Sequence, residues 1–343
     1  MTIRTAIIGY GFAARTFHEP FLRHNKAFKL VAASGSNAAQ AKALWPTVDC
    51  FVSVDELLDK SDADLFIIAT PNDSHFTLAK HLLKKGKHLL IDKPVCTSVS
   101  ELKQLQALEA RSVSGSITVF QNRRWDGDFM TLKQLIKDEK VGVVKRFESH
   151  FDRARPTPQN RWREKPGDGA GIWFDLGPHL IDQTLQLFGK PNAISADIQV
   201  LRDGAKVDDY FDITLNYEDK VVKLNSSPFC YGPPLRFDLQ GSHARFVKYG
   251  LDPQESKLIK QQAFKEENWA AEALNCYGCL YTHEGNDSVK TLEGSYETFF
   301  EELAGFIQRK NGNPVDLNSV ADQLTLLELG IRASQTRTTM DLN

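Results

Sequence analysis

The sequence lacks the features of a membrane protein or a nucleic-acid-binding protein. No apolar run reaches the roughly 18 residues that a membrane-spanning helix needs, and the first residues form no signal-like apolar segment. Lysine and arginine (42) nearly balance aspartate and glutamate (44), so the net charge is −2. A near-neutral chain has no basic excess to attract nucleic acid or an anionic membrane. We therefore expect no nucleic-acid partner and no membrane partner.

Cysteine is also scarce. Five cysteines in 343 residues are too few for a disulfide scaffold and favour a reducing compartment, so we expect a cytoplasmic protein. Cys276 and Cys279 have C-x-x-C spacing, with His283 shortly after them. No second ligand pair is close in sequence, and the strand–helix context of a redox motif is missing. We expect two incidental thiols and no metal site.

Residues 1–121 alternate short apolar runs with helical patterns. The apolar runs cover residues 5–8, 30–33, 50–52, 65–69, 88–91 and 117–120, and the helical patterns cover 14–23, 38–44, 54–58, 75–85 and 99–111. Strands that alternate with helices indicate a parallel sheet covered on both faces. The sequence therefore predicts an α/β protein that begins with a Rossmann-type, doubly wound, dinucleotide-binding domain.

Residues 122–343 follow a different pattern. Apolar and polar residues alternate in the segments 144–151, 193–200, 211–217, 221–226, 235–240 and 245–248, and helical patterns occupy 130–137, 175–188, 296–309 and 320–334. Such alternation is typical of an antiparallel sheet with one solvated face. We predict a second α/β domain, for substrate binding, with a large, mostly antiparallel open sheet. A cleft between the domains would bring cofactor and substrate together.

A glycine-rich turn follows the first apolar run. The sequence Gly9-Tyr10-Gly11-Phe12-Ala13-Ala14 has the form G-x-G-x-x-A between a predicted strand and a predicted helix. Gly9 permits a tight turn, Gly11 lets the backbone approach a pyrophosphate, and the helix N-terminus favours its negative charge. The context predicts dinucleotide binding, although small residues also occur in ordinary strand-to-helix turns.

The end of the second predicted strand indicates which dinucleotide binds. NAD-binding proteins place an acidic residue about 20 residues after the glycines, to hold the ribose 2′-hydroxyl. No acidic residue occurs between Phe28 and Val48, and the strand ends instead in Ser34, Ser36 and Asn37, with Lys42 further on. Small donors and a cation suit a 2′-phosphate. We expect NADP as the cofactor, with NAD as the alternative.

Two further segments follow predicted parallel strands, at the carboxyl edge where such sheets bind ligands. Thr70-Pro71-Asn72 would line the cofactor, or would form a simple turn in which Asn72 or Ser74 caps the next helix. Lys93, after Asp92 and before Pro94, could hold a substrate hydroxyl and the nicotinamide ribose, or could be a solvated surface lysine. The predicted cofactor-binding residues are Gly9, Gly11, Phe12, Ala13, Ser34, Ser36, Asn37, Thr70, Pro71, Asn72 and Lys93.

Asp175 and His179 are the strongest catalytic candidates of the second domain. Their i, i+4 spacing puts them on one face of the helix predicted from residue 175. A histidine beside a carboxylate can act as general acid and base. The alternative is that Asp175 only caps the helix, with Pro178 tolerated in its first turn.

Arginine and tryptophan gather in three strings, at residues 122–126, 152–155 and 161–164. Aromatic faces and hydrogen-bonding cations suit a polyhydroxylated ligand, although surface ion pairs or a subunit contact would explain them equally well. The predicted substrate-binding residues are Asn122, Arg123, Arg153, Trp162, Asp175 and His179.

Taken together, these motifs resemble the glucose–fructose oxidoreductase / inositol dehydrogenase family. The resemblance rests on G-Y-G-F-A-A, Thr70-Pro71-Asn72 with His75, Gly86-Lys87-His88, Asp92-Lys93-Pro94 and Asp175-x-x-x-His179. Longer strings resemble its NADP-dependent scyllo-inositol dehydrogenase branch: residues 122–126, 149–153, 161–164, 175–183 and 248–255. Many family members carry Glu where this chain has Asp92.

The resemblance implies an NADP-dependent dehydrogenase acting on a carbinol carbon of a cyclic polyol or sugar. It implies that His179 transfers the proton, that Asp175 holds a substrate hydroxyl, and that Lys93 lies between cofactor and substrate. It also implies a homodimer or homotetramer formed through the second domain's sheet. The alternatives within the family are a non-catalytic NADP-binding regulator and a redox-assisted glycoside hydrolase.

Overall fold

The computed structural model describes residues 2–342, which form two compact units. The first unit comprises Met1–Asn122, Glu255–Glu266 and Ser295–Ala321. The second unit comprises Arg123–Gln254, Glu267–Gly294 and Asp322–Asn343. Each unit is described by itself. No helix of the described residues is both long and apolar enough to cross a membrane.

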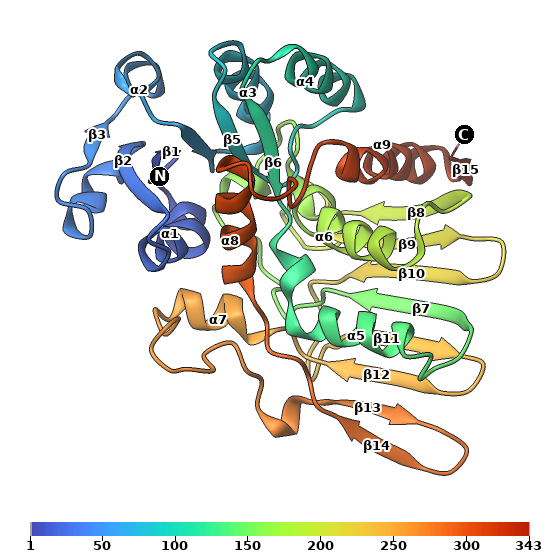
Figure 1. Cartoon of the computed structure of the whole chain (residues 1–343). Coiled ribbons are helices and arrows are strands. Elements are labelled where there is room, and N and C mark those ends of the chain that lie inside the picture. The colour runs from blue at the N-terminus through green and yellow to red at the C-terminus, as the bar shows by residue number, and fades with distance from the viewer. Residues whose placement is uncertain (1, 343) are drawn as a thin grey trace. The chain divides into compact units, whose positions relative to one another are not determined.

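The first unit contains a six-stranded parallel sheet in the order β3-β2-β1-β4-β5-β6 (Figure 1). Its strands are β1 (Ile3–Ile8), β2 (Phe28–Ser34), β3 (Asp49–Phe51), β4 (Leu65–Ile68), β5 (His88–Asp92) and β6 (Ser116–Phe120). The central strands are buried along nearly their whole length, as the continuous apolar runs predicted. The doubly wound dinucleotide-binding order is confirmed.

Helices connect these strands. They are α1 (Glu19–His24), which continues a π-helical segment Ala14–His18, then α2 (Val54–Lys60), α3 (His75–Lys84) and α4 (Val99–Arg111), with 3₁₀ segments Ala38–Ala43, Asn72–Ser74 and Asn318–Val320. Ser98 caps α4 by accepting the Glu101 N–H at 3.2 Å. Gly86 adopts φ +70° directly after α3, in the left-handed conformation common for a glycine at the end of a helix.

A helix from late in the chain completes the core of the first unit. Phe300 of α8 (Tyr296–Ile307) stacks on Phe21 with ring centroids 4.9 Å apart, and Phe299 meets the edge of Phe120 at 5.1 Å. The Val119 N–H donates to the Val315 carbonyl at 2.9 Å. The parallel sheet therefore depends on residues almost 200 positions further along the chain.

The second unit contains a nine-stranded sheet in the order β14-β13-β12-β11-β7-β10-β9-β8-β15. Its strands are β7 (Val144–His150), β8 (Ala193–Gln199), β9 (Tyr210–Asn216), β10 (Val221–Ser226), β11 (Leu235–Gly241), β12 (Arg245–Tyr249), β13 (Gly278–Tyr281), β14 (Asn286–Val289) and β15 (Met340–Asp341). All neighbours are antiparallel except β7 and β10. The mostly antiparallel sheet is confirmed, and Cys279 lies in its strand β13.

Helices α5 (Gly127–Lys137), α6 (Gly171–Phe188) and α9 (Ala321–Thr336) lie over one face of this sheet (Figure 1). The 3₁₀ segments Asn122–Trp125, Trp162–Glu164 and Leu274–Cys276 lie in connections, and helix α7 (Pro253–Ile259) begins in this unit and continues in the first. Residues of β9 alternate between buried and half-buried, as a sheet with one covered face requires.

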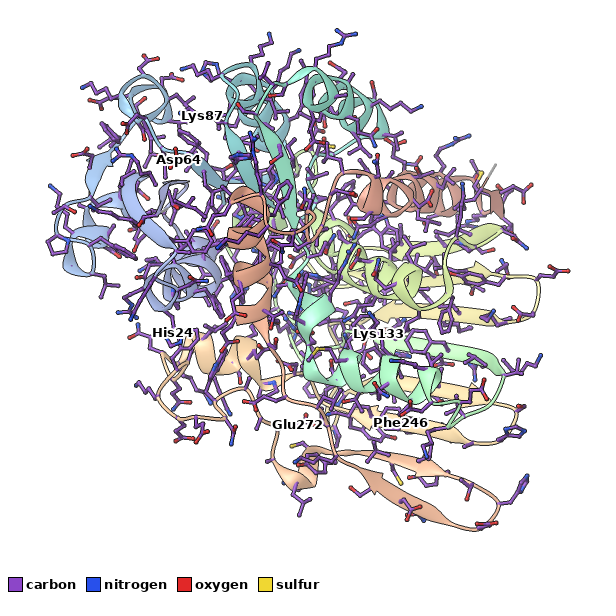
Figure 2. All side chains as sticks on the ribbon, viewed as in Figure 1. His24, Asp64, Lys87, Lys133, Phe246 and Glu272 are labelled. Atoms are coloured by element: carbon purple, nitrogen blue, oxygen red, sulfur yellow. The ribbon has the colours of Figure 1, made fainter. Side chains whose placement is uncertain are left out.

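Buried charges fix the connections of the second unit. Lys248 of β12 pairs with Glu272 at 2.8 Å, and both side chains are almost fully buried (Glu272 is labelled in Figure 2). Asp252 accepts the N–H groups of Gly127 at 2.7 Å and of Gln254 at 2.8 Å. Burial, together with the nearby charges of Asp126 and Asp128, raises the pKa of Asp252. The string at residues 248–255 thus has a structural role.

Candidate active site

The glycine turn after β1 has the shape that a pyrophosphate site needs. Gly9 adopts φ +88°, and a Cβ there would lie 2.7 Å from the Ala69 carbonyl oxygen. The space over Gly11 is open, because a Cβ would meet only the Gly9 carbonyl oxygen, at 3.8 Å. Within the described chain no side chain caps the helical segment that begins here. Its N–H groups, including those of Phe12 and Ala13, are therefore suited to an anion.

The end of β2 supports this turn and supplies donors. Ser34 is fully buried, and its carbonyl accepts the N–H groups of Gly9 at 3.1 Å and Tyr10 at 2.8 Å, so it acts through its main chain. Its hydroxyl makes no hydrogen bond with any described residue. Ser36 is exposed and Asn37 is half-buried. The residues present therefore fit a dinucleotide, with small donors where the ribose would lie.

The structure adds Arg15, which sequence reasoning missed. Its Nη1 donates to Gln40 Oε1 at 2.9 Å, and Gln40 Nε2 donates to Asn37 Oδ1 at 3.3 Å. Its Nε also donates to the Gly11 carbonyl at 3.2 Å. A cation from the fingerprint helix thus lies at the end of β2, although the two are distant in sequence. In the sequence, the only signal that Arg15 lies beside the glycine turn is its position one helical turn after Gly11.

His75 joins the ends of β4 and β5. Its Nδ1 lies 2.9 Å from the Pro94 carbonyl oxygen and its Nε2 lies 2.9 Å from the Thr70 carbonyl oxygen. The Ser74 hydroxyl bonds the Pro71 carbonyl at 2.7 Å and caps no helix. Asn72 begins the 3₁₀ segment and is buried. One imidazole thus connects the loop of Thr70, Pro71 and Asn72 with the segment that follows Lys93.

Lys93 follows directly after β5, at the carboxyl edge of the sheet. The preceding residue, Asp92, pairs through Oδ1 with His18 Nε2 at 2.8 Å. Burial alone would raise the pKa of Asp92, but the charge and hydrogen bond of His18 lower it below its usual range. His18 was not predicted, because nothing in its sequence spacing connects it to Asp92. The pair holds the main chain from which Lys93 extends.

Asp175 and His179 lie one turn apart on α6 in the second unit. The helix begins at Gly171, so Asp175 is not its cap and Pro178 lies inside it. The helix begins before Asp175 because Asp208 Oδ2 accepts the Trp173 N–H at 2.7 Å and stabilises the first turn of α6. Burial raises the pKa of Asp208 to about 6. His179 is buried, and both Asp175 oxygens accept from Arg163 Nη1, at 2.8 and 2.7 Å.

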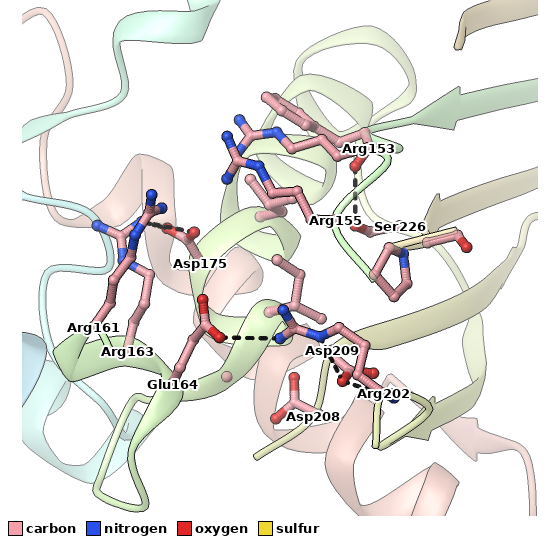
Figure 3. Close-up of a pocket in the computed structure, with 16 residues that line it drawn as sticks. Arg153, Arg155, Arg161, Arg163, Glu164, Asp175, Arg202, Asp208, Asp209 and Ser226 are labelled. Atoms are coloured by element: carbon pink, nitrogen blue, oxygen red, sulfur yellow. Dashed lines mark hydrogen bonds and ion pairs between the residues drawn. The ribbon is translucent and has the colours of Figure 1, made fainter. Parts of the chain in front are cut away.

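A pocket in the second unit contains Asp175 in its wall (Figure 3). About 550 Å³ of empty space lies within it, a volume that includes space open to solvent. Five arginines contribute to its lining: Arg153, Arg155, Arg161, Arg163 and Arg202. Arg202 bonds Asp209 at 2.9 Å and lies 3.3 Å from Glu164, so it fixes the wall of the pocket.

The remaining predicted substrate residues have different surroundings. Asn122 is buried at the end of the first unit's main segment. Arg123 pairs with Asp126 at 3.2 Å and lies over the Phe151 ring, while Arg153 lies over the same ring at 4.8 Å. Trp162 is 40% exposed beside the guanidinium of Arg163. Of these residues, only Arg153 lines the pocket with Asp175.

Among the described residues, no group of three or more His, Cys, Asp or Glu side chains could hold a metal ion. Cys276 is exposed, Cys279 is half-buried, and both are free thiols. The candidate chemistry therefore rests on nitrogen and oxygen side chains: Lys93 in the first unit, and Asp175 and His179 in the second.

The parallel sheet with its glycine turn, followed by a unit with an acid–histidine pair beside a pocket, defines an NAD(P)-binding oxidoreductase. Residues 3–117 match the model described as "Oxidoreductase family, NAD-binding Rossmann fold". Residues 129–247 match the GFO/IDH/MocA C-terminal domain. The chain belongs to the GFO/IDH/MocA oxidoreductase family.

Relatives extend over the whole chain. The oxidoreductase YdgJ of Escherichia coli (strain K12), named as uncharacterized, is 40% identical over 344 residues, which is 99% of both chains. The scyllo-inositol 2-dehydrogenase (NADP(+)) IolW of Bacillus subtilis (strain 168) is 30% identical, covering 99% of this chain and 96% of that protein. The structure of YvaA from Bacillus subtilis is similar with a TM-score of 0.94 at 28% identity, covering 100% of this chain and 99% of that one.

Proposed function

We propose that the protein is an NADP(H)-dependent dehydrogenase that oxidises a carbinol carbon of a cyclic polyol or sugar, or reduces the corresponding ketone. The observation that carries the proposal is the position of Asp175 in the wall of a pocket that five arginines help to line, with His179 one turn along the same helix. The relationship to an NADP-dependent scyllo-inositol 2-dehydrogenase supports the cofactor and the substrate class.

Each side chain has a distinct role in this proposal. His179 accepts the hydroxyl proton during oxidation and returns it during reduction. Asp175 accepts a hydrogen bond from a substrate hydroxyl and orients it. Lys93 stabilises negative charge that develops on the reacting oxygen, and the His18–Asp92 pair positions the segment that contains Lys93. When bound, the nicotinamide supplies hydride exchange at its C4.

The preference for NADP is part of the proposal. Ser36, Asn37 and Arg15 would hold the 2′-phosphate, and no carboxylate in residues 28–48 would repel it. The backbone of Gly9 to Ala13 would hold the pyrophosphate, and Thr70 to Asn72 would line the nicotinamide side. We also propose that copies of the chain associate as a dimer or tetramer through the nine-stranded sheet.

The test is a spectrophotometric assay with a panel of inositols and sugars, each offered with NADP and with NAD. A dehydrogenase reduces cofactor in bulk, and NADP gives the higher kcat/KM. Cofactor binding without turnover of any polyol would instead indicate a regulator. Glycoside cleavage without bulk reduction would indicate a redox-assisted hydrolase.

The variant His179→Ala tests whether His179 transfers the proton. We expect His179→Ala to lower kcat by about 10²–10⁴-fold, the usual contribution of a general acid–base, while NADP binding stays close to that of the parent. Titration of NADP by protein fluorescence checks the binding. A kcat within a factor of two of the parent would remove His179 from the scheme.

A further inference from the structure

We propose that the substrate carries an anionic group, a carboxylate or a phosphate, which Arg155 and Arg161 bind in the pocket beside Asp175. The inference rests on the proposed function and narrows its substrate class. A neutral polyol needs hydrogen-bond donors and acceptors, but it does not need several guanidinium groups around one small pocket.

The charges of the pocket do not balance within the protein. Five arginines face four carboxylates, namely Glu164, Asp175, Asp208 and Asp209. Three of these carboxylates are committed: Asp175 to Arg163, and Glu164 and Asp209 to Arg202. Asp208 is occupied by the Trp173 N–H. In the described part of the chain, neither Arg155 nor Arg161 forms an ion pair.

These two arginines come from segments that the fold holds in place. The Arg155 N–H donates to the Pro228 carbonyl at 2.7 Å, which ties the segment after β7 to the segment after β10. The Gln159 N–H donates to Glu164 at 2.6 Å, and the Arg161 N–H donates to the Gln159 carbonyl at 2.9 Å. Both guanidinium groups therefore extend from anchored main chain.

The side chains converge on the same part of the pocket. Figure 3 shows Arg153 and Arg155 extending from the segment after β7 toward the side where Arg161, Arg163 and Asp175 lie. Arg155 and Arg161 are both exposed, so water screens their mutual repulsion, and an anion that binds between them can pair with both guanidinium groups. An arginine guanidinium presents paired N–H groups that match the oxygens of a carboxylate or phosphate.

The position of Asp175 sets the size of the ligand. Because Asp175 and the two arginines line the same pocket, the anionic group and the reacting hydroxyl belong to one small molecule. A sugar acid or a sugar or inositol monophosphate has this form. The proposal thus selects a charged member of the polyol and sugar class.

The experiment compares matched neutral and anionic substrates with NADP: glucose against glucuronate and glucose 6-phosphate, and myo-inositol against its monophosphates. We expect a kcat/KM for at least one anionic member at least 10-fold above that of its neutral counterpart. The carboxylate and phosphate arms show which anion the pocket prefers. Equal or better kcat/KM for the neutral member of every pair would overturn the proposal.

Variants connect this preference to the two arginines. Arg155→Gln and Arg161→Gln should each lower the anionic-to-neutral ratio of kcat/KM by about 10-fold to 100-fold, as the loss of one charge-assisted hydrogen bond implies. Arg332→Gln, on the exposed face of α9, is the matched control and should leave the ratio unchanged. An unchanged ratio in both pocket variants would also overturn the proposal.

Further measurements test anion binding in the parent enzyme and the folding of the variants. Inorganic phosphate should inhibit the parent enzyme competitively with its sugar substrate, and no such inhibition would count against the pocket. Circular dichroism and NADP titration confirm that the variants are folded. Absence of nicotinamide reduction with every neutral and anionic compound would instead refute the proposed function, so the two failures are distinguishable.

Discussion

At the scale of single residues, the contacts of Arg15 support its proposed role in binding the 2′-phosphate of NADP. Its guanidinium reaches Gln40, which in turn bonds Asn37 at the end of β2. In the proposed binding of NADP, a residue of the glycine-turn helix therefore acts together with the end of the second strand.

We expect Arg15→Ala to raise KM for NADP by on the order of 10-fold or more, with little change for NAD, because only the 2′-phosphate loses a charge-assisted hydrogen bond. Initial-rate kinetics with both cofactors check this. Arg4→Ala is the control, since Arg4 forms an exposed pair with Asp62 at the opposite end of β1. Equal changes in the two KM values would show that Arg15 does not recognise the phosphate.

Asp208 is a second residue of interest, because it makes the stability of the protein depend on pH. Burial raises its pKa from 3.8 to about 6, so between these values the folded chain binds a proton more tightly than the unfolded chain. The contribution of Asp208 to the free energy of unfolding therefore decreases as pH rises through this window. Above about pH 6 the buried carboxylate is ionised, and its full destabilising effect is present.

We expect Asp208→Asn to lack this pH dependence while its amide oxygen still accepts the Trp173 N–H. The free energy of unfolding of the variant minus that of the parent should become more positive between pH 4.5 and 7, as measured by urea denaturation. A difference that stays constant with pH would contradict the raised pKa of Asp208.

At the scale of elements, the packing of α6 on α9 positions the candidate catalytic residues. Trp173 is buried between these helices and donates its indole N–H to the Leu327 carbonyl at 3.0 Å. A Cβ at Gly330 of α9 would lie 2.7 Å from the Trp173 ring, and one at Gly177 of α6 would also lie 2.7 Å from it. Glycines on both helices make room for the indole.

We expect Gly330→Ala to destabilise the protein by about 1–3 kcal/mol, because overpacking against Trp173 outweighs the better helix propensity of alanine. Thermal and urea unfolding measure this. Gln335→Ala, at an exposed position of the same helix, should change the stability by less than about 0.5 kcal/mol. A stabilised Gly330→Ala variant would show that the indole can move without cost.

At the scale of the whole molecule, the chain returns to complete its first unit. Residues 295–321 supply Phe299, Phe300 and Val315 to the core and to the edge of the parallel sheet. A dinucleotide-binding sheet that appears continuous in sequence is therefore discontinuous as a folded unit.

We expect a fragment of residues 1–122 to be unfolded or aggregated, since Phe21 and Phe120 would be exposed without α8. Joining residues 295–321 to this fragment through a flexible linker should restore cooperative unfolding and NADP binding. Circular dichroism during heating and fluorescence titration distinguish the two fragments. A cooperative, NADP-binding 1–122 fragment would contradict the role of α8.

Much of the fold follows from local sequence. Continuous apolar runs predicted the parallel strands, alternating runs predicted the antiparallel sheet, and Gly9 to Ala14 marked the strand-to-helix turn, because side-chain periodicity and backbone freedom are local properties. Local signals failed at α6, where the sequence indicated a start at Asp175. The contact that moves the start to Gly171 comes from Asp208, more than thirty residues later.

The sequence by itself determined the class of fold, the glycine turn and the candidates Lys93, Asp175 and His179. Only the tertiary structure decided that His18 pairs with Asp92, that Arg15 reaches the end of β2, and that Arg155 and Arg161 share a pocket with Asp175. These relationships join residues from separate segments. No periodicity encodes them, because they arise when strands and helices pack and bring distant charges together.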